Sequence, residues 1–156
     1  MEEIKIQLVK HINGGEAFIP VDKLLEFITF EKLFKRPRHL PYSFFEILYH
    51  MRFAQKDLLE YCMDLEYSNY KWPDDYWPSD NKVEANEEWE VLILKFKEER
   101  QQLIDHILDS ENKLLAPVNA KTNNNLLREI LLVIEHNAYH TGQLLIVLRS
   151  LDLYPA

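Results

Sequence analysis

Apolar side chains recur every three or four positions along most of the chain, which is the spacing of one face of an α-helix. The pattern predicts a short helix over residues 3–13, ended by Gly14 and Gly15, and a second short segment over 20–29. Three longer helices are predicted from Pro41 to about Leu65, from Val83 to Asn112, and from Asn124 to Leu151. Four substantial helices joined by short and medium loops are typical of an all-α four-helix bundle.

The segments between these helices carry their own signals. The stretch "SFFE", from Ser43 to Glu46, matches a capping box at a helix start, and the asparagines of "NAKTNNN" suit the cap of the last helix. The segment "NYKWPDDYWPSDN" is a loop, interrupted by prolines and dense in aromatic side chains. We interpret it as a cover for one end of the bundle. The alternative is that it walls one side of a pocket above a metal site.

Length and composition fit one globular domain over residues 1–156, with 47% apolar and 28% charged residues. The net charge of −8 disfavours a nucleic acid or an anionic membrane as the main partner, because both repel a negative surface. The basic stretch "KLFKRPRHL" is short and is interpreted as a solvated loop. A single cysteine, Cys62, permits no intrachain disulfide, and neither a signal peptide nor a membrane span is visible. We therefore expect a cytoplasmic protein.

The last predicted helix is strongly apolar but is interrupted by the polar stretch "EHNAYHTGQLL", residues 135–145. His136 and His140 are four positions apart, so their imidazoles lie on one face and can converge on one metal ion. Apolar neighbours place them on a buried face, where Tyr139 and Gln143 complete a polar strip directed at least partly into the bundle. Since an unpaired buried polar group costs about 1–3 kcal/mol, these groups need partners.

The other four histidines differ in how well they are placed to supply a third ligand. His50 lies in mid-helix among mostly apolar same-face neighbours, whereas His106 is expected to be exposed, His39 lies in the basic loop and His11 is ambiguous. Three histidines would leave open positions for water or substrate, which is the pattern of catalytic metal sites. The alternative for His50 is a core histidine bonded to a backbone carbonyl. Glu46, one turn away, is placed to orient the His50 imidazole or to relay a proton.

Two further residues narrow the chemistry. In the zinc-protease helix H-E-x-x-H the glutamate is the general base, but Asn137 occupies that position here, which disfavours a metalloprotease of that type. We expect Asn137 to bond between helices or across a dimer. Cys62 is twelve residues from His50, about 120° around the helix, so it does not share the histidine face. A buried apolar role is expected for this thiol, and not that of a nucleophile.

The stretches "LPYSFFEILYHMRFAQKDLLEY", "KWPDDYWP", "LLAPV" and "LLREILLVIEHNAYHTGQLLIVLRSL" together resemble the DinB-like family, over about residues 37–155. The most specific pieces are the histidine followed by Met-Arg at His50 and the block His-Asn-x-Tyr-His-x-Gly-Gln that begins at His136. The resemblance implies a four-helix bundle with up-down-down-up connectivity. It also implies one divalent metal ion, such as nickel or zinc, bound by His50, His136 and His140.

The resemblance further implies an activity and a partner. Characterised members transfer low-molecular-weight thiols such as bacillithiol or catalyse a mycothiol-dependent isomerisation, and many form homodimers. We therefore expect a metal-dependent enzyme whose site activates a thiol for transfer, or water for hydrolysis, on a small-molecule substrate. Glu46, Tyr139 and Gln143 are expected around the ligands. The alternative is a non-enzymatic bundle in which a metal braces the fold or a dimer.

Overall fold

The computed structural model describes residues 1–63, 66–79, 86–119 and 122–154. Within these ranges the regular structure is helical and contains no strand, so the all-α prediction is confirmed. The α-helices and two single-turn 3₁₀ segments are α1 (Glu2–Asn13), α2 (Val21–Leu25), η1 (Phe30–Lys32), α3 (Phe44–Met63), η2 (Asp74–Tyr76), α4 (Asn86–Leu108) and α5 (Leu126–Ser150). Over the described residues, no helix is both long and apolar enough to cross a membrane.

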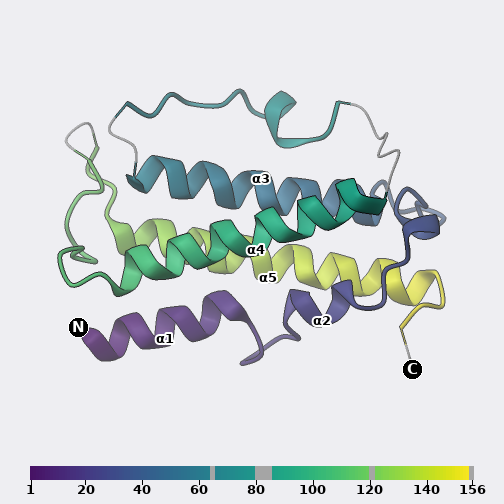
Figure 1. The fold of residues 1–156 in the computed structure, drawn as a ribbon, viewed down its shortest axis with the longest axis horizontal. Helices are drawn as coiled ribbons and strands as arrows, with labels where there is room; N and C mark the ends of the chain where they lie inside the picture. Colours follow the sequence, from purple (N-terminus) through teal and green to yellow (C-terminus); the bar gives the residue numbers. More distant parts are fainter. Residues whose placement is uncertain (64–65, 80–85, 120–121, 155–156) are drawn as a thin grey trace.

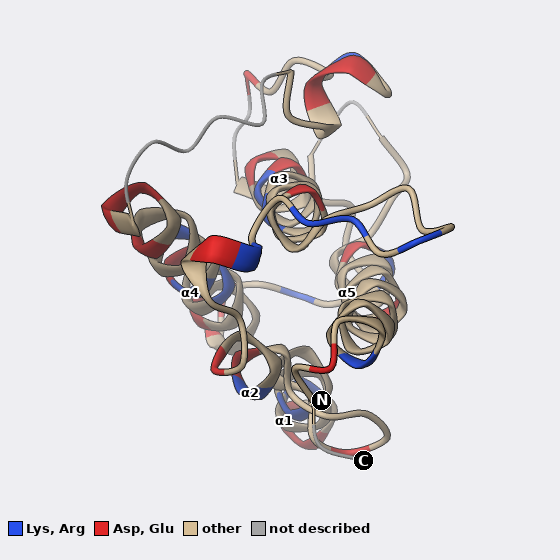
Figure 2. Cartoon of the chain, turned by 90° about the vertical axis from the view of Figure 1, so that its right-hand side faces the viewer, with Lys and Arg blue, Asp and Glu red and all other residues tan. Residues whose placement is uncertain are grey.

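The four longest of these helices lie side by side around a common core. Figure 1 shows α1 and α5 running in one direction and α3 and α4 in the other, the order that the family resemblance implies. Seen along the helix axes in Figure 2, α3, α4 and α5 surround the core, with α1 and α2 on the side opposite α3. Buried side chains such as Phe44, Met51 and Phe96 fill the interior near the C-terminal end of α5, and Leu103, Ile107 and Ile130 fill the other end.

The helix ends follow the capping chemistry of the sequence. At the start of α3, the Ser43 hydroxyl and backbone N–H both donate to the Glu46 carboxylate at 2.8 Å, so the capping box is confirmed. Asn125 caps α5 by accepting a hydrogen bond from the backbone N–H of Arg128 at 3.0 Å. The second predicted segment, 20–29, is helical only over α2, and tight i→i+3 bonds follow it.

Helix α4 ends four residues before the predicted Asn112. Its last turn is closed by the Asn112 side chain, which donates to the backbone carbonyl of His106 at 2.9 Å. The Asp109 carboxylate accepts from the backbone N–H of Glu111, which forms a turn instead of a further helical turn. The predicted start at Val83 and the predicted end of the preceding helix at Leu65 lie outside the described residues.

The aromatic segment over residues 66–79 does not cover a bundle end. It runs along the outer side of α3, above the helix in Figure 1. Tyrosine hydroxyls of the segment donate to carboxylates on α3: Tyr67 and Tyr76 to Asp57, and Tyr70 to Glu60 at 2.6 Å. These bonds hold η2 against the middle of α3, where His50 lies, so the interpretation of the segment as an end cover is wrong.

Candidate metal centre

Helices α3 and α5 bring three histidines together. His50 on α3 meets His136 and His140 on α5, and one possible ligand atom from each lies within 4.8 Å of the other two. The Nε2 atoms of His50 and His136 are 3.0 Å apart, and the three ring centroids are separated by 4.4 to 4.8 Å. His50 and His140 are buried and His136 is half-buried. The structure therefore joins the three residues that the sequence selected from the six histidines of the chain.

Two of the rings have their Nδ1 atoms engaged outside the cluster. The Nδ1–H of His50 donates to the backbone carbonyl of Tyr76 in η2, at 3.1 Å, because a carbonyl oxygen can only accept. The Nδ1–H of His140 donates to the side-chain oxygen of Gln143 at 2.7 Å. In a neutral imidazole this leaves Nε2 unprotonated, with a lone pair that can bind a metal ion. Bonds of this kind orient metal-binding histidines.

The ring of His50 combines a feature of each sequence interpretation, one at each ring nitrogen. Its Nδ1 is bonded to a backbone carbonyl, as in a core histidine, and its Nε2 faces His136. Helical periodicity does not indicate Tyr76 as the partner, because the contact depends on where the loop after α3 folds back. The one sequence feature related to this contact is the group of tyrosines in the loop, whose hydroxyls donate to Asp57 and Glu60 on α3.

Burial and mutual repulsion keep the cluster uncharged. Burial, followed by the proximity of His140 and His50, lowers the pKa of His136 from 6.5 to about 3. Burial, followed by His50, lowers the pKa of His140 to about 4, and burial also lowers the pKa of His50. Neutral imidazoles with free lone pairs are the form that binds metal ions. The three donors thus fit a divalent ion such as zinc or nickel.

A stack of aromatic rings covers one side of His50. The Trp77 ring lies parallel to the His50 ring, with centroids 4.1 Å apart and an angle of 1° between the planes. Tyr42 stacks in turn on Trp77 at 5.2 Å and 13°. The aromatic segment therefore provides both a hydrogen-bond acceptor and a flat wall for His50, which agrees with the alternative interpretation of a wall beside the metal site.

The three supporting residues named from the sequence have different surroundings. Gln143 contacts the cluster through His140. Tyr139 touches the His140 ring edge-on at 4.9 Å, but its side chain is 65% exposed, so the polar strip does not point inward along its whole width. Glu46 is held by Ser43 and by an ion pair with Arg36 at the start of α3. The hydrogen bond at His50 Nδ1 goes to the Tyr76 carbonyl, and the role expected for Glu46, to orient His50 or to relay a proton, stays a prediction.

The helical periodicity explains why Tyr139 is exposed. Asn137, Thr141 and Leu144 are buried, so the inward face of α5 is centred on their side, and His140 lies near it while Tyr139 lies beyond its edge. Asn137 bonds between helices as expected, donating to Gln55 on α3 at 3.4 Å. Gln55 in turn donates to the backbone carbonyl of Phe96 on α4 at 2.9 Å, so these two amides link three helices.

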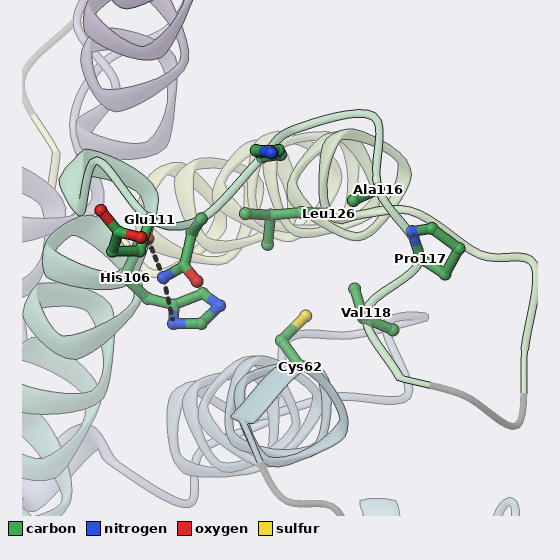
Figure 3. Close-up of a pocket in the computed structure, with 9 residues that line it drawn as sticks. Cys62, His106, Glu111, Ala116, Pro117, Val118 and Leu126 are labelled. Carbon is green, nitrogen blue, oxygen red and sulfur yellow. Dashed lines mark hydrogen bonds between the residues drawn. The ribbon is translucent and has the colours of Figure 1, made fainter.

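Other candidates from the sequence lie away from the cluster. His11 and His39 are exposed. His106 is half-buried instead of exposed, because its ring Nδ1 accepts a hydrogen bond from Asn112 at 3.1 Å. Figure 3 shows the Cys62 sulfur and the His106 ring facing a separate cavity. Burial, followed by the charge of Glu129, raises the pKa of Cys62 to about 12, so this thiol stays protonated, in keeping with a buried, unreactive role.

Comparison with protein families identifies the chain. A family model described as the DinB superfamily matches residues 21–144, from α2 through the three histidines and into the second half of α5. Comparisons with curated proteins and with solved structures give no significant match. The match covers well over half of the chain, and the three histidines meet where the sequence resemblance implied. The chain belongs to the DinB superfamily.

Proposed function

We propose that this protein is a metal-dependent enzyme that binds one divalent ion through His50, His136 and His140. The observation that carries the proposal is the cluster itself, with a possible ligand atom from each histidine within 4.8 Å of the others. The histidines are uncharged, and His50 and His140 each donate a hydrogen bond through Nδ1 to a group outside the cluster. Both features support metal binding by the Nε2 atoms. A bound divalent ion would lower the pKa of a thiol or a water and hold it as a nucleophile.

An open position distinguishes a catalytic metal site from a structural one. Over the described part of the chain, the cluster of histidine, cysteine and carboxylate side chains has three members. A tetrahedral structural site uses four protein ligands, whereas three leave a position for a substrate or a solvent molecule. This supports the enzyme over the alternative of a bundle braced by metal.

The surroundings of the cluster favour a thiol over water as the group that is activated. Hydrolysis at such a site commonly uses a carboxylate as general base, but Asn137 occupies the position of that glutamate on α5. The Glu46 carboxylate is committed to Ser43 and Arg36, and Asp57 accepts from two tyrosines. A thiol loses its proton on binding to a metal, without such a base. We therefore favour transfer of a low-molecular-weight thiol to a small electrophilic substrate.

The roles of the chain's own residues follow from the contacts. Tyr76 and Gln143 fix the tautomers of two histidines, and Trp77 shields one face of His50 from water. Cys62 does not compete as an internal thiol, because it is buried at the other cavity and its pKa is raised. The nucleophile would therefore come from solution.

Elemental analysis tests the proposal directly. Protein purified without a histidine tag, and again after loading with zinc or nickel, should hold close to one metal ion per chain. A His140→Ala variant should lose the metal but stay folded, because a site that binds ligands contributes less to the fold than a structural site. Protein that takes up no stoichiometric metal in either preparation contradicts the proposal. Sedimentation velocity measures the homodimer that the family resemblance implies, which stays a prediction.

A further inference from the structure

A small apolar cavity lies next to the histidine cluster along the groove between α3 and α5. Its volume is about 170 Å³. Its lining is apolar apart from one amide and one phenol, and includes Leu40, Tyr42, Ile47, Gln143, Ile146 and Val147. Ile47 and Val147 are buried in the core, while Ile146 is 53% exposed. The cavity therefore has a rigid apolar floor and a side chain at its rim that faces solvent.

The position of the cavity follows from the helix register. Ile47 precedes His50 by three residues on α3, and Gln143 follows His140 by three residues on α5, so each lies one turn from its histidine on a shared face. Because α3 and α5 run in opposite directions, both steps lead toward the same end of the bundle (Figure 1). One helical turn is about 5 Å, which is within the length of a small molecule.

Two side chains that line the cavity lead to the histidine cluster. Gln143 lines the cavity and accepts the hydrogen bond from His140. Tyr42 lines it and stacks on Trp77, whose ring covers His50. The cavity is thus connected to the candidate metal centre by direct side-chain contacts.

The volume and polarity of the cavity determine which chemical groups it can bind. A cavity of roughly 150 Å³ with apolar walls holds benzene in proteins and stays dry when empty. Among the residues that line this cavity there is no charged side chain. A charged or strongly hydrated group would lose its hydration here without compensation.

We infer that this cavity binds a benzene-sized apolar group, a phenyl ring or a branched alkyl chain, of the substrate whose reactive end lies at the three histidines. The second part of this inference rests on the proposed function, whereas binding of an apolar group by the cavity does not. It narrows the substrate class to small molecules that carry one such group about one helical turn from their reactive atom. Burial of a group of this size strengthens binding by roughly tenfold or more.

The first experiment uses the metal-free full-length chain. Toluene is titrated while amide chemical shifts are followed, and saturable changes are expected over residues 40–47 and 143–147. Ile146→Asp places a charge at the rim and should weaken toluene binding at least fivefold, at little cost to folding because the side chain is half exposed. The matched control is Leu131→Asp, a 43% exposed leucine on the same helix, which should bind toluene like the wild type. Circular dichroism verifies that both variants fold.

The second experiment uses zinc-loaded protein. Benzyl mercaptan should bind at least tenfold more tightly than 2-mercaptoethanol to the wild type and to Leu131→Asp, and Ile146→Asp should remove the preference. Absence of saturable toluene binding, or equal toluene binding by Ile146→Asp, overturns the assignment of the cavity. Toluene binding without a preference between the thiols overturns its link to the metal site. If the protein holds no zinc, the proposed function fails, and the toluene titration alone decides for or against the cavity.

Discussion

Replacing Trp77 by alanine tests how the aromatic segment supports the histidine cluster. The Trp77 ring is parallel to the His50 ring at 4.1 Å and stacks on Tyr42 at 5.2 Å. Each ring pair contributes about 0.5–1.5 kcal/mol beyond the burial of its surface, so the loss of stacking alone removes roughly 1–3 kcal/mol. For a chain of 156 residues this corresponds to a fall in melting temperature of roughly 2–12 °C.

The effect on metal affinity should exceed what lost stability explains. Loss of a group that orients a metal-binding histidine costs about 10- to 100-fold in affinity. Because the Tyr76 carbonyl would still accept from His50, the lower end, about tenfold, is expected. The apparent dissociation constant for zinc is measured by competition with a chromogenic chelator, at a temperature where both proteins are folded.

Trp72→Ala is the matched control, since Trp72 lies in the same segment. Its side chain is 65% exposed, and its ring is tilted by 60° at 6.1 Å from His50. The control should bind zinc within about twofold of the wild type, well below the roughly 10- to 100-fold loss expected when a supporting group is removed. Equal zinc affinity in Trp77→Ala and wild type, or an equal loss in both variants, would show that stacking on His50 does not position that ligand.

Three further substitutions or treatments give separate tests. Gln143→Leu removes the acceptor for His140 and should weaken zinc binding about tenfold, measured with the same chelator, while unchanged affinity would remove Gln143 from the site. Ser43→Ala removes the hydroxyl of the capping box and should lower the free energy of unfolding in urea by about 1 kcal/mol, and a change below the error of the measurement would contradict the capping role. The pKa of Cys62 is raised from 9.0 to about 12. The native protein should therefore react with a disulfide reagent at pH 8 roughly a thousandfold more slowly than urea-unfolded protein. Comparable reaction rates of native and unfolded protein would refute the burial of this thiol.

The helices were predictable because local chemistry decides them. The Ser43 cap and Gly14, which has a φ of 74°, mark ends that short sequence patterns specify. The end of α4 was placed too late, because Asn112 continues the helical composition while its side chain caps the last turn from outside the helix. Helix ends of this kind depend on whether an asparagine continues the helix through its backbone or caps the last turn through its side chain. Composition does not reveal which of the two occurs.

From the sequence, only those residues of the site whose position follows from helical periodicity were predictable. The spacing of His136 and His140 and the apolar neighbours of His50 place the three rings on facing sides of two helices. The same periodicity misplaced Tyr139, because a residue three positions from His136 lies at the edge of the buried face and is 65% exposed. It also left Tyr76 unassigned, because a backbone carbonyl in a loop has no sequence signature.

The hydrogen bonds of the aromatic segment connect the loop after α3 to the histidine cluster. Asp57 accepts from Tyr67 and Tyr76, and Tyr76 presents its carbonyl to His50, so a carboxylate two turns along α3 fixes the tautomer of a candidate ligand through the loop. A ligand fixed only by its own helix would keep its rotamer freedom, and part of the affinity for a metal would be lost in ordering it. The dense tyrosines of this segment therefore serve the candidate metal centre more directly than they serve the helical core.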